Sequence, residues 1–316
     1  MSIYLKSNIQ NKMIKKKSFF SRAYKALTHP NLLAQYLLVN YFAPLFSDKS
    51  FIKLKSKLIF GKSFDLDNPI TFNEKMNWLK LNDRNPSYSN LVDKLKVKEH
   101  VAKLIGNEFV VPLISKWDRI EEIDFYNLPD KCVLKTNQDS GGAIIYEKGK
   151  SNYKMILKQL NNRMHLFNYY YYSREFPYKG VVKKIFAEQF LDNGNEIDLL
   201  NDYKFWCFNG EPKIMYVTVK SSSIYENFYD MEFNPIQIKH GSPRRVPEFE
   251  KPKDFEKMKE LASILSKDIP FVRVDFFYVR EKIYFGEYTF FDWGGFKPFE
   301  DNWDIKIGEH LKLPIS

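Results

Sequence analysis

Residues 273–296, RVDFFYVREKIYFGEYTFFDWGGF, contain two isolated acids, Asp275 and Glu287, in an otherwise apolar and aromatic segment. The pattern predicts a β-hairpin of strands 273–279 and 283–289 joined by a three-residue turn. With that turn, the two acids face each other directly on one side of the sheet. Like charges in this position destabilise a strand pair, and the neighbouring aromatic rings make burial of the charges costlier.

Three arrangements would stabilise this acid pair: a protonated carboxyl group, a neighbouring cation such as Arg273, or a bound divalent metal. Mg²⁺ fits because it prefers hard oxygen ligands, uses few protein carboxylates and completes its shell with water and phosphate oxygens. We therefore predict that Asp275 and Glu287 are magnesium ligands, with neutralisation by Arg273 or another cation as the alternative. The prediction depends on the turn, because a shift of one residue would change the register.

The net charge of +10 is unevenly distributed along the 316 residues. Residues 1–62 hold twelve Lys or Arg and one acid, Asp48, for a net +11, so residues 63–316 are almost balanced at −1. A balanced body argues against nucleic-acid binding, which favours a basic face on the folded domain. Only Cys132 and Cys207 are present, which favours a reducing, cytoplasmic location over a disulfide scaffold.

Residues 26–46 form an uncharged, mostly apolar stretch within the basic extension. His29, Pro30 and several amide side chains interrupt it, which disfavours both a transmembrane helix and a signal peptide. Two interpretations stay open. Residues 1–46 bind an anionic membrane surface through a helix, placing the protein peripherally on the inner face of the cytoplasmic membrane, or the helix packs on the body with a solvated basic flank.

The remaining sequence alternates short helices and strands in an α+β pattern with antiparallel sheets. Thr71 or Asn73 can cap the first helix, and Asn209-Gly210 suits a tight hairpin turn. Helices are expected within 68–86 and at 89–105, 153–168 and 255–266, and strands at 109–114, 132–136, 143–146, 184–191, 203–208 and 213–219.

The segment LKTNQDSGGAIIY (134–146) predicts a strand ending at Lys135, a turn with Ser140, Gly141 and Gly142, and a returning strand. Glycines let backbone N–H groups approach an anion, and the lysine adds a positive charge. The turn is therefore a candidate phosphate cradle. It does not have the spacing of a Walker A loop, and no G-x-G-x-x-G dinucleotide turn occurs in the chain.

Two other strands carry polar residues with two interpretations each. Glu188 can accept a hydrogen bond from an adenine amino group while the backbone near Leu191 contacts the ring edge. The segment alone favours an edge strand with a solvated glutamate. Lys204 shares a strand face with Asp202 and can reach a phosphate, although an ion pair on the surface is the commoner arrangement.

Six segments in one order resemble the TupA-like branch of the ATP-grasp superfamily, found in teichuronopeptide and capsular polysaccharide synthesis. The resemblance covers roughly residues 45–314. The segments that carry it are SDKSFIKLKSKLIFGKSFDLDNPITFNEKMNWLK (47–80), VDKLKVKEHV (92–101), LPDKCVLKTNQDSGG (128–142), REFPYKGVVKKIFAEQFL (174–191), DYKFWCFNGEPK (202–213) and the hairpin quoted above. The resemblance implies two α+β lobes with antiparallel sheets that hold ATP. The implied organisation is a basic helical extension (1–62), a helical region (63–130), a small lobe with the glycine loop (131–192) and a C-terminal lobe with the metal site (193–316).

The resemblance also implies roles for individual residues. Arg273 would steady the negative charge of a tetrahedral intermediate, and Lys204 would assist catalysis. Asp275 and Glu287 would bind Mg²⁺, and Thr289, where many relatives have asparagine, leaves the number of Mg²⁺ ions open. Glu196 and Asp198 are candidates for the ribose-binding acid. The ATP-binding residues would be Lys94, Lys135, Ser140, Gly141, Gly142, Glu188, Leu191 and Lys204.

The implied function is an ATP-dependent carboxylate–amine ligase that forms an amide through an acyl phosphate. The branch suggests a uronic acid of a capsule or cell-wall glycan as one substrate and an amino acid or amine as the other. Residues 168–180, with four tyrosines and Arg174, form either an acceptor surface or ordinary packing, and Asp292 to Gly295 would shape the acceptor pocket.

Two other functions compete with the ligase. Asp65-Leu66-Asp67 could hold the metal-bound diphosphate of a sugar-nucleotide glycosyltransferase, but it precedes an Asn-Pro turn and follows no nucleotide-binding α/β unit. A non-catalytic membrane- or polyanion-binding module, built on the basic extension, is the third hypothesis.

Overall fold

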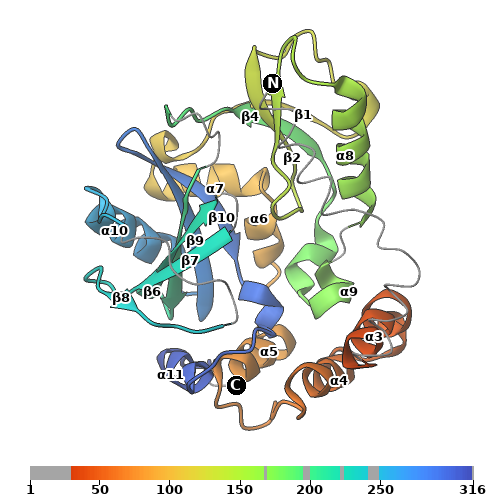
Figure 1. The fold of residues 1–316 in the computed structure, drawn as a ribbon, viewed down its shortest axis with the longest axis vertical. Coiled ribbons are helices and arrows are strands. Elements are labelled where there is room, and N and C mark those ends of the chain that lie inside the picture. The colour runs from red at the N-terminus through yellow and green to blue at the C-terminus, as the bar shows by residue number, and fades with distance from the viewer. Residues whose placement is uncertain (1–29, 167–168, 195–199, 221–223, 241–248, 315–316) are drawn as a thin grey trace. The chain divides into compact units, whose positions relative to one another are not determined.

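The computed structural model describes residues 30–166, 169–194, 200–220, 224–240 and 249–314 (Figure 1). The chain divides into two compact units, Met1–Ser63 and Phe64–Ser316.

The described part of the first unit is helical. It contains α3 (Pro30–Leu37), a short π-helical turn (Leu38–Phe42), a 3₁₀ turn (Ala43–Leu45) and α4 (Asp48–Phe60). The Ser47 side chain caps α4 by accepting the Ser50 N–H at 3.2 Å. Within residues 30–314 as far as the structure describes them, no helix is both long and apolar enough to cross a membrane. The predictions for residues 1–29 lie outside the described residues.

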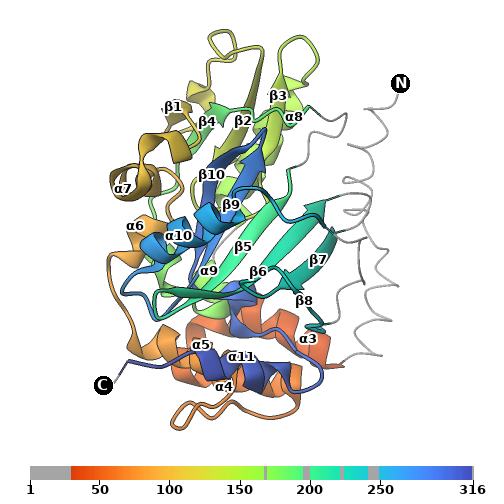
Figure 2. The same ribbon diagram turned by 90° about the vertical axis from the view of Figure 1, so that its left-hand side faces the viewer.

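The second unit contains two antiparallel sheets (Figure 2). The four-stranded sheet has the order β1 (Leu113–Trp117), β4 (Ile185–Gln189), β2 (Lys131–Thr136), β3 (Ile144–Glu147). The six-stranded sheet has the order β10 (Lys282–Thr289), β9 (Phe271–Val279), β5 (Asp202–Phe208), β6 (Glu211–Lys220), β7 (Ile224–Tyr229), β8 (Pro235–Ile236). These sheets confirm the predicted α+β class, and the smaller one takes in β1 in addition to the predicted range 131–192.

Seven α-helices accompany these sheets in the described part of the unit: α5 (Phe72–Asn82), α6 (Tyr88–Val92), α7 (Lys96–Ile105), α8 (Tyr153–Leu166), α9 (Tyr169–Ser173), α10 (Phe255–Ser266) and α11 (Trp303–His310). Short 3₁₀ turns lie at Asn107–Phe109, Ile120–Glu122, Phe176–Gly180 and Asp292–Gly295. The predicted strand at 109–114 is wrong in its position. Pro112 has no N–H to give to a strand ladder, so the strand begins after it.

The predicted helix at 89–105 is interrupted. Asp93 has an extended backbone, and its carboxylate accepts the N–H groups of Leu95 at 2.9 Å and Lys96 at 3.3 Å, which starts a new helix. Lys94 therefore lies between α6 and α7, and its N–H is free to donate to the Asn137 carbonyl at 3.0 Å. The interruption brings Lys94 next to the end of β2.

The β9–β10 hairpin differs from the prediction in its turn but not in its central pair. The turn has two residues, Arg280 and Glu281, with φ of 50° and 58°, and the strands pair from Val279↔Lys282 onward. A bulge at Gly286 then adds one residue to β10, so that Glu287 lies opposite Asp275 after all. A β-carbon on Gly286 would lie 3.1 Å from the Asp275 carbonyl oxygen, which explains why glycine occupies the bulge.

The two faces of the large sheet are covered differently (Figure 2). Helix α10 packs on one face, where the Phe205 ring lies 5.9 Å from that of Phe255 and the Tyr288 hydroxyl donates to the Leu265 carbonyl at 2.8 Å. On the opposite face, α5 covers the far end of β5, since Phe72 packs 5.4 Å from Trp206. Residues that alternate with Phe205 and Tyr288 therefore point away from α10.

We expect Thr71→Ala to lower the free energy of unfolding by about 1 kcal/mol, because Thr71 caps α5 in a reciprocal capping box with Glu74. Thr71→Ser is the matched control, since it keeps the hydroxyl acceptor. Urea unfolding followed by circular dichroism measures both variants. Equal stability of the alanine and serine variants would contradict the capping role.

Candidate active site

The acid pair of the hairpin belongs to a row of side chains across three strands. Lys204 of β5 pairs with Asp275 of β9, which pairs with Glu287 of β10. Directly opposed residues share a face, so all three side chains lie on the face opposite α10. Their side chains are 13%, 5% and 23% exposed, respectively. The prediction that Asp275 and Glu287 lie opposite each other is confirmed.

Arg273, two residues before Asp275 on the same face, neutralises the acids. Its Nε and Nη2 donate to the two oxygens of Asp275, each at 2.7 Å, and Nη2 also donates to Glu287 Oε1 at 3.1 Å. Its Nη1 donates to Asp292 and, at 3.2 Å, to the Tyr216 hydroxyl. All five N–H groups of the guanidinium thus have an acceptor.

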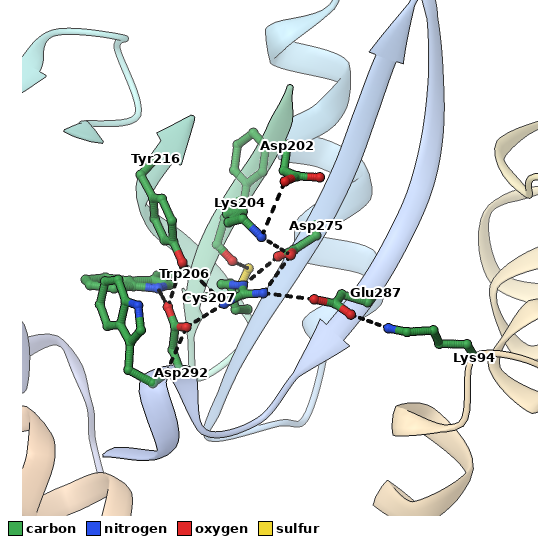
Figure 3. Close-up of polar contacts among 12 residues, drawn as sticks. Lys94, Asp202, Lys204, Trp206, Cys207, Tyr216, Asp275, Glu287 and Asp292 are labelled. Atoms are coloured by element: carbon green, nitrogen blue, oxygen red, sulfur yellow. Dashed lines mark hydrogen bonds and ion pairs between the residues drawn. The ribbon is translucent and has the colours of Figure 1, made fainter. Parts of the chain in front are cut away.

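Two lysines complete the charge balance. Lys204 Nζ donates to Asp275 Oδ2 at 2.7 Å, and Lys94 Nζ donates to Glu287 Oε2 (Figure 3). The lysine that the helix interruption frees therefore reaches the large sheet. These contacts show the alternative arrangement, in which Arg273 and other cations neutralise the acid pair. A metal can bind between the same two acids as well only if their oxygens keep enough lone pairs.

The pKa shifts follow from these contacts. Burial alone would raise the pKa of Glu287, but Lys94, Arg273 and Lys204 outweigh it and hold the pKa well below its ordinary value. Burial and Arg273 alone would lower the pKa of Lys204, but Asp275 and Asp202 outweigh them and raise it. The pKa of Arg273 is raised because Asp275 and Asp292 outweigh its burial. Glu287, Lys204 and Arg273 are therefore charged at neutral pH.

The donor set fits a magnesium ion. Each carboxylate oxygen has two lone pairs. Of the four oxygens of Asp275 and Glu287, Asp275 Oδ2 alone receives two hydrogen bonds, one from Arg273 and one from Lys204. Asp275 Oδ1 and both oxygens of Glu287 each receive one, so each keeps a lone pair for a metal. In the described ranges no three His, Cys, Asp or Glu side chains form a larger metal-ligand cluster. Two hard carboxylates are the set that Mg²⁺ uses together with phosphate oxygens.

The small sheet carries a second charged cluster. Glu188 accepts from Lys135 through Oε1 and from Lys98 through Oε2 at 3.1 Å, and Lys98 also donates to the Val111 carbonyl at 2.7 Å. Strand β4 lies inside the sheet and Glu188 is 5% exposed, so the interpretation as a solvated edge glutamate is wrong. Burial alone would raise the pKa of Glu188, but Lys135 and Lys98 lower it.

Lys98 is a site residue that the sequence reasoning missed. It lies four residues after Lys94 in VDKLKVKEHV, in the first turn of α7. Burial lowers its pKa, while Glu188 raises it. The only available signal was the regular spacing of lysines in that segment, which is equally typical of a solvated helix face.

The predicted glycine turn follows β2. Ser140 and Gly141 are exposed and Gly142 is buried, and Gly141 has a positive φ of 68°. A β-carbon on Gly142 would overlap the carboxylate of Asp139, which forms an ion pair with Arg163 of α8. The turn is therefore fixed at its base by an ion pair and open at its tip.

The two charged clusters lie close together. Lys135 Nζ of the small sheet lies 6.0 Å from the centre of the Phe277 ring, which is on the same face of β9 as Asp275. Lys94 joins the two sheets, because its N–H binds Asn137 after β2 while its side chain binds Glu287. One site can therefore draw on both sheets, as the resemblance implied.

The structure gives other places to several predicted residues. Asp65 closes a local turn by accepting the N–H groups of Asp67 at 3.0 Å and Asn68 at 2.9 Å, which explains the Asp-x-Asp pattern without a metal. Arg174 is 1% exposed with its guanidinium 5.1 Å from the Tyr170 ring centre, so it is not part of a surface for an acceptor.

Residues at the edges of the predicted site are only partly described. Leu191 is half-buried and lies two residues after the end of β4. Its predicted contact with adenine stays a prediction. Asn168 and the candidate ribose-binding acids, Glu196 and Asp198, lie outside the described residues.

We expect Glu188→Gln to lower the free energy of unfolding by about 3 kcal/mol at pH 7, because it leaves two lysines without their buried counter-charge. The pKa of Glu188 is lower in the folded than in the unfolded protein. Its stabilisation is thus present above about pH 4.3 and is lost as the pH falls from there through the folded pKa. Urea unfolding at pH 7 and at acid pH should show a difference between variant and wild type that shrinks in acid.

The exposed pair of Glu122 with Arg119 supplies the control, since Glu122→Gln should leave the unfolding free energy almost unchanged at either pH. A Glu188→Gln effect that is as small, or that does not shrink with falling pH, would contradict the buried ion-pair network.

Solved structures with some similarity to this chain include three enzymes. A D-alanine–D-alanine ligase from Bacillus anthracis, complexed with ATP, is 12% identical, with 63% of this chain and 53% of that chain covered and a TM-score of 0.36. The ATP-grasp ligase PsnB with a minimal precursor is 9% identical (76% and 61% covered, TM-score 0.37), and N5-carboxyaminoimidazole ribonucleotide synthetase from Thermus thermophilus is 12% identical (76% and 52% covered, TM-score 0.38).

This chain therefore spans about half to three fifths of the length of these enzymes, and their similarity is too low to assign residues or substrates. No curated protein matches the chain. The family comparison is far more specific. The family described as "TupA-like ATPgrasp" matches residues 74–312, which include both sheets and both charged clusters. The chain belongs to the TupA-like ATP-grasp family.

Proposed function

We propose that this protein is an ATP-dependent carboxylate–amine ligase that uses Mg²⁺ and forms an amide through an acyl phosphate. The observation that carries the proposal is the pair Asp275 and Glu287, opposed on one sheet face and surrounded by Arg273, Lys204 and Lys94. A stable fold gains little from burying these charges, since an apolar set of similar volume is often as stable. Membership of the ATP-grasp family supports the same function.

The proposed nucleotide site draws on both sheets. Lys94 and Lys204 would contact the terminal phosphates next to the metal acids, and Lys135 would contact phosphate from the small sheet. Ser140, Gly141 and Gly142 would cover the phosphates through backbone N–H groups. Glu188 and Leu191 would lie at the adenine, although Lys135 and Lys98 already occupy the glutamate carboxylate. The chemistry that Mg²⁺ supplies when bound is neutralisation of negative charge on the phosphate oxygens.

The reaction has two steps. An oxygen of the substrate carboxylate attacks the γ-phosphorus of ATP, the bond to ADP breaks, and an acyl phosphate forms. The amine nitrogen then attacks the acyl carbon, the bond to phosphate breaks, and an amide, phosphate and a proton are released. Lys94 and Lys204 would stabilise the charge on the transferred phosphoryl group, and Arg273 the charge on the tetrahedral intermediate.

A covalent nucleophile of the protein is not required. Both cysteines are buried, and burial raises the pKa of Cys132 to about 11 and that of Cys207 to about 12. At neutral pH they are therefore thiols, which are poor nucleophiles. Positioning and charge stabilisation are the contributions that the side chains of this site can make.

The proposed substrates are a uronic acid, free or within a capsule or cell-wall glycan, and an amino acid or another amine. The resemblance to the TupA-like branch supports this class. Tyr171 and Tyr172 of α9 are 40% and 59% exposed and offer rings on which a sugar can pack. Arg174 is not part of this proposed surface, because it is buried.

We expect Asp275→Asn and Glu287→Gln each to reduce ADP release by at least about 100-fold, because each removes a charge that holds the metal and the phosphates. The measurement is a screen of ADP release with Mg²⁺ and ATP over uronic acids crossed with amino acids. Asp65→Asn is the control, since its carboxylate only closes a turn. Full activity of either site variant would contradict the proposal, and release of UDP or GDP from a sugar nucleotide would support a glycosyltransferase instead.

We also propose that residues 1–46 bind an anionic membrane surface on the cytoplasmic side. The described part of this segment exposes large apolar side chains, among them Leu32 (54%), Tyr41 (62%), Phe42 (47%) and Leu45 (77%). The segment lies within the 62 residues that carry twelve basic side chains. Apolar side chains next to a cationic region are the combination that binds anionic lipid surfaces.

The full-length protein should sediment with vesicles that contain phosphatidylserine but not with pure phosphatidylcholine vesicles. The double variant Phe42→Asp and Leu45→Asp should weaken this binding by at least about tenfold, because it removes two large apolar contacts. Tyr126→Asp, at a side chain that is 83% exposed in the other unit, is the control. Equal binding to both vesicle types, or none, would contradict membrane attachment.

A further inference from the structure

Asp292 is the most deeply buried acid of the site and follows β10 closely along the chain. Its side chain is 1% exposed, compared with 9% for Arg273 and 23% for Glu287. Asp292 Oδ1 accepts from Arg273 Nη1 and from the Trp293 N–H at 3.0 Å. Its Oδ2 accepts from Trp206 Nε1 at 2.7 Å and from the Tyr216 hydroxyl at 2.9 Å.

These four donors fill the four lone-pair positions of the Asp292 carboxylate. Asp275 and Glu287 keep lone pairs for a metal, whereas Asp292 keeps none. The Asp292 oxygens therefore offer no further acceptor to a substrate, and the expectation that Asp292 to Gly295 shape an acceptor pocket stays a prediction. What Asp292 can do is hold its donors in place.

We propose that Asp292 is a positioning residue of the ligase reaction, which fixes the guanidinium of Arg273 from its buried side. This inference rests on the proposed function. Arg273 Nη1 donates to Asp292 and Tyr216, whereas Nε and Nη2 donate to Asp275 and Glu287. Asp292 and Tyr216, called the anchor below, thus hold the guanidinium on its buried side. Its other side faces Asp275 and Glu287, the proposed metal ligands.

Tyr216 and Trp206 complete this anchor. The Tyr216 hydroxyl accepts from Arg273 Nη1 and donates to Asp292 Oδ2, so the three side chains form a closed triangle of hydrogen bonds. Trp206 fixes the same oxygen of Asp292 from β5. A guanidinium held in this way cannot rotate away from the acids, and a cation stabilises a developing negative charge best when it is already in place.

The turn that carries Asp292 has an unusual backbone and is bound by helix α5. Trp293 and Gly294 have left-handed φ values of 47° and 63°. Lys80 Nζ of α5 donates to the Gly294 carbonyl at 2.5 Å, and Asn77 donates to the Gly295 carbonyl at 2.7 Å. Helix α5 thus fixes the turn that carries Asp292.

The test combines kinetics with a direct observation of Arg273. Asp292→Asn replaces one acceptor oxygen by an amino group that would face other donors. We expect kcat for ADP release to fall by about 10- to 100-fold, with KM for ATP changed less than about threefold. Tyr216→Phe should show a smaller loss of the same kind. In ¹⁵N-labelled full-length protein, the Nε–H signal of Arg273, assigned through Arg273→Lys, should be rigid in wild type and mobile in Asp292→Asn.

Asp304→Asn is the matched control. Asp304 is also a buried acceptor, binding the backbone and side-chain N–H groups of Asn73 at 2.9 Å, but it does not touch Arg273. The Asp304→Asn variant should be less stable than wild type but keep the wild-type kcat and the rigid Arg273 signal. A kcat within threefold of wild type together with a rigid Arg273 in Asp292→Asn would overturn the proposal.

The two proposals fail separately. If Asp292→Asn does not fold, an unchanged kcat and an unchanged Arg273 signal in Tyr216→Phe overturn the anchor. If the folded wild-type protein releases no ADP with any acceptor, the ligase function fails, and the Arg273 signal in the variants alone decides whether Asp292 positions the arginine.

Discussion

The guanidinium of Arg273 is the group on which the arrangement of the large sheet's polar face depends. Its five N–H groups connect Asp275, Glu287, Asp292 and the Tyr216 hydroxyl. Without a cation at this point, two opposed carboxylates and a third buried acid would repel one another in a region with little water. A planar, permanently charged fork is suited to this task, because it binds several acceptors at fixed angles, which a lysine ammonium does not do.

Local irregularities place the remaining charges of the site. The bulge at Gly286 brings Glu287 opposite Asp275, and the helix interruption at Asp93 frees Lys94 to reach Glu287. Without the bulge in β10 or the interruption of the helix, one of these side chains would point to another face of its element or lie at another position along it. Glu287 and Lys94 therefore lie at irregularities of a strand and of a helix. On the opposite face of the large sheet, regular side-chain packing against α10 stabilises the sheet.

The small sheet also has a buried acid bound by cations, but its cluster carries an excess of positive charge. One buried acid, Glu188, is shared by Lys98 and Lys135, so a positive charge is left over near the glycine turn. In the large sheet, Lys94, Lys204 and Arg273 balance Asp275, Glu287 and Asp292. Under the proposed function, a polyanionic nucleotide would be attracted to the first cluster and would share its metal with the second. This division of charge agrees with the arrangement that the resemblance implied, in which two lobes hold ATP.

The sequence by itself determined the α+β class, most elements of both sheets, the opposition of Asp275 to Glu287 and the family, because these depend on local alternation, turn residues and segment order. It did not determine how this opposition arises. A two-residue turn and a bulge take the place of the expected three-residue turn, and only the complete pairing of the two strands shows this. Lys98 and the anchor at Asp292 were decided by the tertiary structure alone. Their partners lie far away in the chain, Glu188 for the lysine and Trp206 and Tyr216 for the aspartate, and a buried charge acquires its role from the groups that neutralise it.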